Sequence, residues 1–449
     1  MTTPIVDFVR RYRESGARRL HMPGHKGAAL LGPEALDITE ISGADVLYAP
    51  RGIIRESEEN AARLFGARRT VYSCEGSSLG IRAMLFLAAQ AAREQGRAPV
   101  IAAGRNAHKV FILAAALLDM DVRWLWGQDS VLRCPVTAAD VEECLRSGEV
   151  TAVYLTSPDY LGNTVDIAAI AAVCHRYGAL LLVDNAHGAY LRFLAPSRHP
   201  LDLGADLCCD SAHKTLPVLT GGAYLHVSES APAWLSDRMD AAMELFASTS
   251  PSWLILQSLD MANALLAGDY PARIRDTAAR LDAMKARLPW DTLGDEPLKL
   301  CIRPKGRGYT GTELAALLEQ QHVFCEFADP DFLVLMVTPE TTADDLAAVE
   351  HVLNEVPARP PINDVPPRLT RPETVLRAHE ALFAPCEIIP VGQCLGRVLA
   401  APTVSCPPAV PIVVSGERID DTALALFAYY DIERCLVTKE SSGNEKPEG

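Results

Sequence analysis

LLLVDNAHGAY (180–190) and DLCCDSAHKTLPVLTGGAYLH (206–226) are the stretches that decide the fold class of this chain. In each, a short apolar run reaches an acid and is followed by small polar residues, a pattern typical of buried strands in an α/β sheet. Asp184 ends the first run, and Lys214 follows the second. Because ligands bind beyond the carboxyl ends of such strands, we expect both side chains at one site.

The same rhythm extends outward from about residue 70 to residue 230. Apolar runs such as TVYS, PVIAA and TAVYLTS alternate with helical patterns such as LGIRAMLFLAAQAA. This alternation predicts a mostly parallel sheet with helices on both faces.

Flanking segments follow other patterns. From residue 296 short strands and two helices indicate a small α+β domain, and a run rich in proline then indicates a linker. Beyond it, RPETVLRAHEALFA (371–384) looks helical, while EIIPV and PIVVS look like strands. The predicted units are an N-terminal segment (1–60), a large domain (61–295), a small domain (296–356), a linker (357–370), a C-terminal unit (371–436) and a disordered tail (437–449).

Composition excludes several classes of protein. The chain has 449 residues, 49% of them hydrophobic and 22% charged, which is ordinary for a folded protein. Its net charge of −15 disfavours nucleic acid as a partner. The twelve cysteines are scattered, no signal peptide is recognisable, and the longest apolar stretch, 110–118, is too short for a membrane span. We expect a cytoplasmic protein with reduced cysteines and no metal.

Lys214 and Asp184 together point to pyridoxal phosphate. A lysine forms a Schiff base with an aldehyde cofactor, and a carboxylate at the pyridine nitrogen keeps that ring protonated. The alternative is a helix-capping aspartate and a surface lysine, which would be the better interpretation of either residue alone.

Two further strand ends suit the same cofactor. Gly76, Ser77 and Ser78 lie between a strand and a helix, where the helix amides can hold a phosphate. As a motif this is weak, since such residues often only cap a helix. His108 follows another strand and could stack on the pyridine ring, or serve as an ordinary capping or core histidine.

Several motifs together resemble the ornithine/lysine/arginine decarboxylase family of fold-type I pyridoxal-phosphate enzymes. They are HMPGHKG (21–27), DITEISGADVLYAPRGIIRESEENAARLFGA (37–67), GRNAHK (104–109), VDNAHGAY, SAHKTLP and CPPAVPIVVSGERI (406–419). The resemblance covers residues 5 to 436 and is to the short bacterial form, without an N-terminal wing domain. It implies an aminotransferase-like fold with a seven-stranded type of sheet.

The resemblance also implies roles for single residues. Lys214 would carry the cofactor, Asp184 would face the pyridine nitrogen, and His108 would stack on the ring. The phosphate end would hold Gly76, Ser77, Ser78, Ser211 and His213, while His187 would position cofactor or substrate. HMPGHKG, GADVLYAPRG (43–52) and Ser250 would lie near the site, partly from a neighbouring subunit, which implies a homodimer or a higher homo-oligomer.

The implied reaction is decarboxylation of a basic amino acid, arginine before lysine or ornithine, to an amine of polyamine biosynthesis. Asp45, Asp159 and Glu417 are candidate acceptors for the distal cation, although each alone is better interpreted as a solvated or structural carboxylate. Lys214, His213 or a water could reprotonate Cα. Departures from the family pattern at Val46, Tyr48 and Cys406 leave the substrate open. The alternatives are an oxoamine synthase or aminotransferase, and a silent regulatory homologue.

Overall fold

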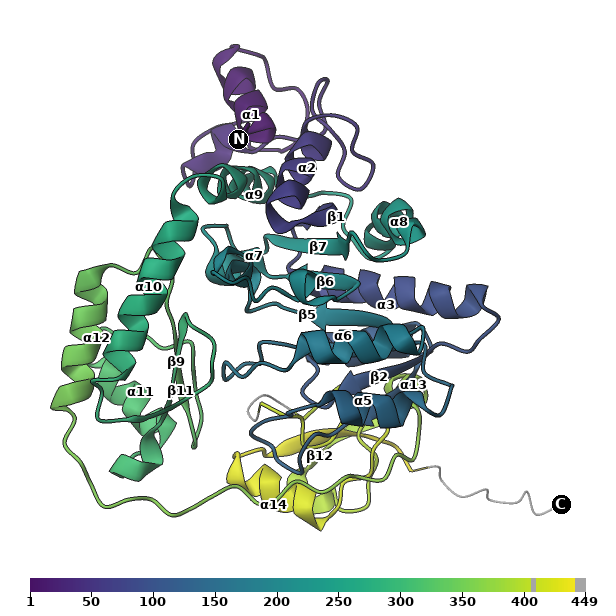
Figure 1. The fold of residues 1–449 in the computed structure, drawn as a ribbon, viewed down its shortest axis with the longest axis vertical. Helices are drawn as coiled ribbons and strands as arrows, with labels where there is room; N and C mark the ends of the chain where they lie inside the picture. The colour runs from purple at the N-terminus through teal and green to yellow at the C-terminus, as the bar shows by residue number, and fades with distance from the viewer. Residues whose placement is uncertain (405–408, 441–449) are drawn as a thin grey trace.

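The computed structural model describes residues 1–404 and 409–440, and its largest element is a seven-stranded sheet. The strand order is β1-β7-β6-β5-β4-β2-β3, with β7 antiparallel to both neighbours and the strands from β6 to β3 parallel (Figure 1). The predicted α/β fold with a mostly parallel sheet is therefore confirmed. The strands are β1 (Ala67–Ser73), β2 (Val100–Gly104), β3 (Asp121–Leu125), β4 (Ala152–Thr156), β5 (Leu180–Asp184), β6 (Leu207–Asp210) and β7 (Ala223–Ser228).

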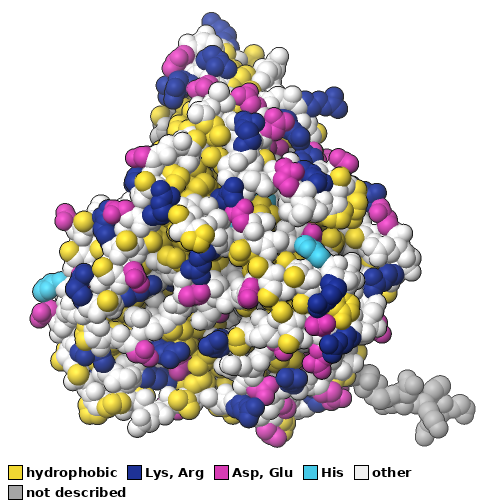
Figure 2. All heavy atoms as spheres, viewed as in Figure 1, with side chains coloured by type: hydrophobic (Ala, Val, Ile, Leu, Met, Phe, Trp, Pro, Cys, Tyr) yellow, Lys and Arg dark blue, Asp and Glu magenta, His cyan; other side chains and the backbone are white. Residues whose placement is uncertain are grey.

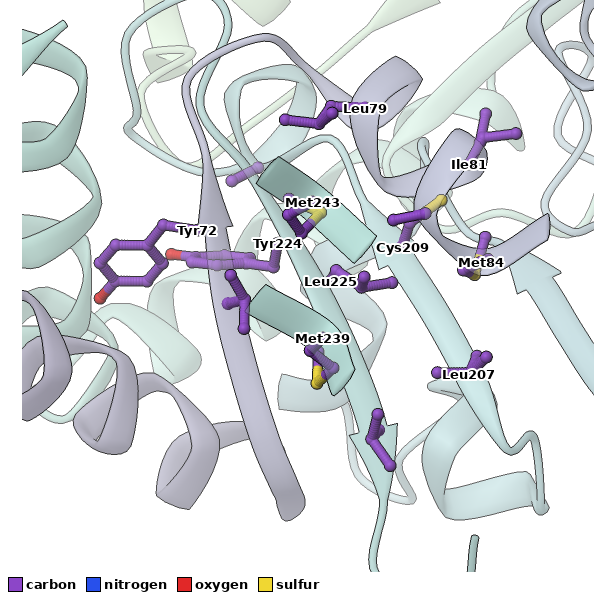
Figure 3. Close-up of a cluster of buried hydrophobic side chains, with 14 of the residues drawn as sticks. Tyr72, Leu79, Ile81, Met84, Leu207, Cys209, Tyr224, Leu225, Met239 and Met243 are labelled. Atoms are coloured by element: carbon purple, nitrogen blue, oxygen red, sulfur yellow. The ribbon is translucent and has the colours of Figure 1, made fainter. Parts of the chain in front are cut away.

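Helices cover both faces of this sheet, because successive side chains of a strand point to opposite faces. Tyr154 and Leu182 enter one buried cluster, and their neighbours Val153 and Leu181 enter another. Figure 3 shows the first cluster, where side chains of α3 and α8 pack on β6 and β7. The flanking helices are α2 (Ile53–Phe65), α3 (Ser77–Glu94), α4 (Lys109–Leu117), α5 (Ala138–Leu145), α6 (Ile167–Arg176) and α8 (Ala233–Glu244).

Strand β3 is an element that the apolar runs did not predict. Its sequence DVRWL carries Asp121 and Arg123, and four of its five residues are partly or fully exposed. Among the described residues it pairs only with β2, and it lies at the edge of the sheet. An edge strand needs no continuous apolar run, since one side of it meets no neighbouring strand.

A four-stranded antiparallel sheet of order β10-β11-β9-β8 follows the large sheet in sequence. Helices α11 and α12 accompany it, while α9 and α10 lead into it from the large sheet (Figure 1). Their bounds are β8 (Asp291–Leu293), β9 (Lys299–Arg303), β10 (Phe327–Ala328), β11 (Leu333–Met336), α9 (Trp253–Leu266), α10 (Tyr270–Lys285), α11 (Gly311–Glu319) and α12 (Ala343–Glu355).

The C-terminal module, which we define as residues 371–404 and 409–440, differs from expectation in three places. The predicted helix at 371–384 is confined to α13 (Ala378–Phe383), and PIVVS forms only an isolated bridge between Val414 and Thr403. The predicted tail begins too early, because residues 437 and 438 belong to β13; residues 441–449 and Cys406 lie outside the described residues. The other elements are β12 (Cys386–Pro390), α14 (Asp421–Tyr429) and β13 (Arg434–Thr438).

A buried carboxylate anchors the N-terminal segment. Helix α1 (Pro4–Glu14) begins against Asp260, whose Oδ2 accepts the backbone N–H groups of Ile5 and Val6 at 3.0 Å each. Short 3₁₀ helices occur at Pro33–Leu36, Ala189–Phe193, Pro200–Leu203, Pro304–Arg307 and Val391–Gln393. Among the described residues no helix has the length and apolar character that a membrane span requires.

Candidate active site

Lys214 and Asp184 meet at the carboxyl edge of the large sheet, as the sequence predicts. Asp184 is the last residue of β5, and Lys214 lies in the short helix α7 (Ala212–Thr215) that follows the adjacent parallel strand β6. Lys214 Nζ is 3.1 Å from His187 Nε2. Burial lowers the pKa of Lys214, while the Asp184 and Glu326 carboxylates act in the opposite direction. A larger neutral fraction makes this amine a better nucleophile.

Asp184 is held in place by two hydrogen-bond donors at the end of β5. It is 2% exposed, its Oδ2 accepts a hydrogen bond from Tyr154 Oη at 2.9 Å, and its Oδ1 accepts one from the Ala186 N–H at 3.2 Å. Donors of this kind stabilise the charged form of a carboxylate. Tyr154 was not predicted from the sequence, although its place on β4, the strand beside β5, brings it to Asp184.

His187 links the lysine to the rim of the site. Its ring is buried, and burial, together with nearby cationic side chains, holds its pKa well below the usual range. Tyr160 packs edge-on against it with ring centroids 5.2 Å apart. The buried Nδ1 of His187 has no hydrogen-bond partner among the described residues, which is expected of an atom that awaits a ligand.

The predicted phosphate cradle lies at the start of α3. Gly76 is its N-cap with φ +69°, a conformation that favours glycine, and no side chain caps the first turn. Ser211 Oγ donates to Ser77 Oγ at 2.7 Å, so the hydroxyl of the residue after β6 meets a hydroxyl of α3 here, with Ser78 next along the helix. One detail differs: the Gly76 N–H donates to Gly221 O at 2.7 Å. Gly76 therefore shapes the turn before α3, and no side chain caps the backbone N–H groups of the first turn of the helix.

The remaining predicted residues lie around this edge. His108 is exposed at the end of β2 and caps α4, with Nδ1 accepting the Val110 N–H at 3.3 Å. His213 Nδ1 is 3.1 Å from Gly222 O. Ser250 is exposed, and its N–H donates to Ser248 Oγ at 3.2 Å. Ser248 N–H in turn donates to Glu75 Oε1 at 2.7 Å, which brings this loop to the residue before Gly76.

A buried network below the site escaped the sequence analysis. Asp210 Oδ2 accepts hydrogen bonds from His199 Nε2 at 3.0 Å and His226 Nε2 at 3.2 Å, and Oδ1 accepts one from Asn185 Nδ2 at 2.7 Å. Burial alone would raise the pKa of Asp210, but the two histidines hold it below the usual range. The network ties the residue after Asp184 to the residue before Ser211, so it fixes the two strand ends relative to each other.

The same place has the spacing of a metal site, with His199, Cys208 and Asp210 close together. Burial raises the pKa of the Cys208 thiol well above its usual value, so this sulfur stays protonated and is a poor ligand. Both Asp210 oxygens are already used by hydrogen bonds. These contacts favour a structural network.

The three acids predicted to receive a substrate cation have other partners. Asp45 accepts five backbone N–H groups around the start of α2, among them that of Gly52 at 2.7 Å. Asp159 accepts the N–H groups of Leu161 and Asn163 at 2.9 and 2.8 Å. Glu417 binds the buried Arg105 with both oxygens at 2.7 Å. These contacts favour a structural role for each carboxylate, which is the interpretation that the sequence analysis preferred for each acid alone.

The donor set fits pyridoxal phosphate. An amine, a buried carboxylate and a helix N-terminus without a side-chain cap lie at one sheet edge, and His187 offers an unpartnered nitrogen. These are the groups that an aldehyde, a pyridine nitrogen and a phosphate require. The fold and the site together define the class of fold-type I pyridoxal-phosphate enzymes.

Comparison with known proteins identifies the family within that class. The model of the Orn/Lys/Arg decarboxylase major domain matches residues 3–287, and that of the family's C-terminal domain matches residues 369–438. The chain therefore belongs to the Orn/Lys/Arg decarboxylase family and is a pyridoxal-phosphate-dependent amino-acid decarboxylase.

Relatives of similar length support this assignment. The chain is 29% identical to an uncharacterised Bacillus subtilis protein, YaaO, over 93% of this chain and 92% of the relative. It is 26% identical to a Bacillus subtilis arginine decarboxylase, covering 93% and 91% of the two chains. The constitutive lysine decarboxylase of Escherichia coli has the same fold, with a TM-score of 0.78 at 17% identity over 98% of this chain and 82% of that one.

Proposed function

We propose that this protein removes the α-carboxyl group of a basic amino acid as carbon dioxide and releases an amine of polyamine biosynthesis. The observation that carries the proposal is the convergence of Lys214, His187 and Asp184 beside the uncapped start of α3. Relatives named arginine decarboxylase favour arginine as the substrate, ahead of lysine and ornithine. Reduced cysteines and action in the cytoplasm remain predictions.

Each part of the site has a separate task in this reaction. When bound, pyridoxal phosphate supplies an aldehyde and a protonated ring that accepts the electron pair left at Cα. Lys214 Nζ would hold the aldehyde carbon and Asp184 the proton on the ring nitrogen. His108 would cover one face of the ring. Ser77 and Ser211, with the first amides of α3, would hold the phosphate.

The proton that returns to Cα has candidates on this chain. Because a carbonyl oxygen only accepts, His213 Nδ1 must carry the hydrogen shared with Gly222 O, which leaves Nε2 of the neutral ring free to accept a proton. Burial lowers the pKa of His213, so the neutral ring dominates at pH 7, and Nε2 would have to take up a proton before it could donate one to Cα. The amine of Lys214 and an ordered water are the other two candidates.

For the distal cation of the substrate we propose Glu326 in place of Asp45, Asp159 and Glu417. It follows α11 and directly precedes β10, and its Oε1 accepts a hydrogen bond from Tyr160 Oη at 3.0 Å. Tyr160 packs on His187, which contacts Lys214, so this carboxylate lies at the outer end of a continuous path from the cofactor's lysine. An exposed carboxylate at that end suits an ammonium or a guanidinium on a substrate side chain.

Replacing Glu326 by glutamine is expected to raise the KM for the basic amino acid about 10- to 100-fold, the loss of one charge-assisted hydrogen bond, with a smaller change in kcat. The glutamine retains an acceptor for Tyr160 Oη, so the packing on His187 should persist. Steady-state kinetics of carbon dioxide release measure this split. Glu319→Gln, an exposed acid at the end of α11, is the matched control. An unchanged KM in Glu326→Gln would exclude Glu326 from substrate binding.

A substrate panel tests the proposed reaction itself. Arginine, lysine and ornithine are each incubated with the holoenzyme, and carbon dioxide and amine are measured. Release of both from any of the three supports decarboxylation, and the specificity constants rank the substrates. Formation of a keto acid, or consumption of an acyl-CoA, would instead support an aminotransferase or an oxoamine synthase. No turnover with any donor would support a silent homologue.

We also propose that two copies of the chain share the site. The N-terminal segment that contains HMPGHKG exposes large apolar side chains, with Leu20 and Leu31 each 92% exposed. In Figure 1 this segment projects beyond the large sheet at one end of the molecule. Figure 2 shows acidic and basic side chains interspersed over the visible face, so charge does not mark another docking surface there. A second copy of the chain would cover these leucines.

Mixing two inactive variants should restore part of the activity if the site is composite. Lys214→Ala removes the amine, and His25→Ala alters HMPGHKG, where His25 contacts Asp37 at 3.2 Å. A mixed dimer would contain one intact site, so up to about a quarter of wild-type activity is expected after subunit exchange. Sedimentation of the wild type and of the mixture measures their oligomeric state. Full activity of a monomer, or no recovery in mixed dimers, would contradict the shared site.

A further inference from the structure

The late motif that ends in VPIVVSGERI (410–419) has no role in the reaction described so far, yet its glutamate reaches the large sheet. Glu417 Oε1 and Oε2 each lie 2.7 Å from the guanidinium of Arg105, the first residue after β2. Arg105 is fully buried and Glu417 is 2% exposed. A bidentate pair of this kind fixes orientation as well as distance.

Further contacts fix the position of the Arg105 side chain. Its Nε and Nη2 donate to the carbonyl oxygens of Pro411 and Ile412 at 3.4 and 3.3 Å. Its guanidinium lies over the rings of Trp124 and Trp126, at 5.0 and 4.4 Å from their centroids. The guanidinium is therefore enclosed between the C-terminal module and the end of β3.

Arg105 starts the tight turn that presents His108. Ala107 N–H donates to Gly104 O at 3.0 Å, and Phe111 N–H donates to His108 O at 2.8 Å, so His108 is the N-cap of α4. The C-terminal module also holds the other end of this helix, where His379 Nδ1 lies 2.8 Å from Ala116 O. Figure 1 shows the module, in green to yellow, beneath this side of the sheet.

We propose that the C-terminal module positions His108 against the cofactor ring, with Glu417 as a positioning residue that acts through Arg105. The inference rests on the proposed function, because it requires pyridoxal phosphate at Lys214. It gives the segment 410–417 a role at the site, although this segment lies about 200 residues beyond Lys214 in the chain.

A double-mutant cycle on cofactor affinity tests the proposal. The dissociation constant of pyridoxal phosphate is measured by absorbance on apoenzyme for the wild type, Glu417→Gln, His108→Ala and the double variant. Loss of one ring-stacking contact corresponds to about tenfold weaker binding. We expect each single variant to lose about this factor and the double variant to lose no more, since both act on the same contact. Glu373→Gln, an exposed acid of the module paired with Arg418, is the control and should bind normally.

Two results would overturn the proposal. Wild-type affinity in Glu417→Gln would show that the pair does not reach the cofactor, and losses that multiply to about 100-fold in the double variant would show independent effects. Thermal unfolding identifies a variant that fails to fold. If Glu417→Gln fails to fold, His379→Ala takes its place in the same cycle, and the same criteria apply. A wild-type apoenzyme that binds no pyridoxal phosphate would contradict the proposed function instead.

Discussion

Replacing Lys214 by alanine is expected to lower kcat by about 10⁴-fold, the upper end of what one proton-transfer group contributes, and to abolish covalent attachment of the cofactor. The variant removes the amine that lies 3.1 Å from His187 Nε2 and whose pKa the Asp184 carboxylate raises against the effect of burial. Borohydride treatment of the wild type should fix pyridoxal phosphate to Lys214, and peptide mapping locates the labelled residue.

The Lys214→Arg variant distinguishes the contribution of a nucleophilic amine from that of a positive charge. Arginine retains a cation near Asp184 but cannot lose its proton at working pH, so it should be as inactive as alanine. Lys439→Ala, an exposed lysine just beyond β13, is the control and should leave labelling and activity unchanged. Reduction that labels another lysine in the wild type, or none in excess cofactor, would refute the role of Lys214.

Asp184→Asn is expected to keep the fold and lower kcat about 100- to 1000-fold, the usual cost of removing one preorganised electrostatic partner. The amide oxygen can still accept from Tyr154 Oη or from the Ala186 N–H, so local packing should persist. What disappears is the negative charge that stabilises a protonated pyridine nitrogen. Turnover kinetics and the absorption spectrum of the bound cofactor measure the loss.

Asp166→Asn provides a matched control for this charge removal. Asp166 is an exposed N-cap, and its carboxylate accepts the Ala169 N–H of α6 at 3.0 Å. Asparagine caps helices about as well as aspartate, so activity and stability should stay near wild type. If Asp184→Asn behaved like this control, Asp184 would be a structural residue and the assignment of the ring partner would be wrong.

The large sheet and the position of its site could be predicted because both follow from local patterns. Buried parallel strands appear as apolar runs, and a polar residue at the end of a run must lie at the carboxyl edge of the sheet. Lys214 and Asp184 follow adjacent strands, so their proximity needed no further information. Edge strand β3 lacked an apolar run. Helix α13 is short because residues 373–376 form backbone hydrogen bonds with residues 416–418 instead of a helix.

Tyr154 and Glu326 show why other parts of the site could not be predicted. Tyr154 lies within an apolar run that is typical of a buried strand, and its hydroxyl reaches Asp184 only because β4 is the neighbour of β5. Glu326 precedes a strand of two residues, and its approach to Tyr160 depends on how the small sheet packs against the loop after β4. No local signal in the sequence distinguishes this acid from other exposed ones.

By itself, the sequence determined the α/β class, the strand ends and the placement of Lys214 and Asp184 at one edge of the sheet. The tertiary structure alone decided which carboxylates bind other groups of the protein and which are exposed to a substrate. Asp45 and Asp159 bind amides a few residues away in the chain, but Glu417 binds an arginine that lies 312 residues before it. Periodicity records which side chains are buried, because burial depends on local alternation. It does not record which buried charges pair, because that depends on segments that only the fold brings together.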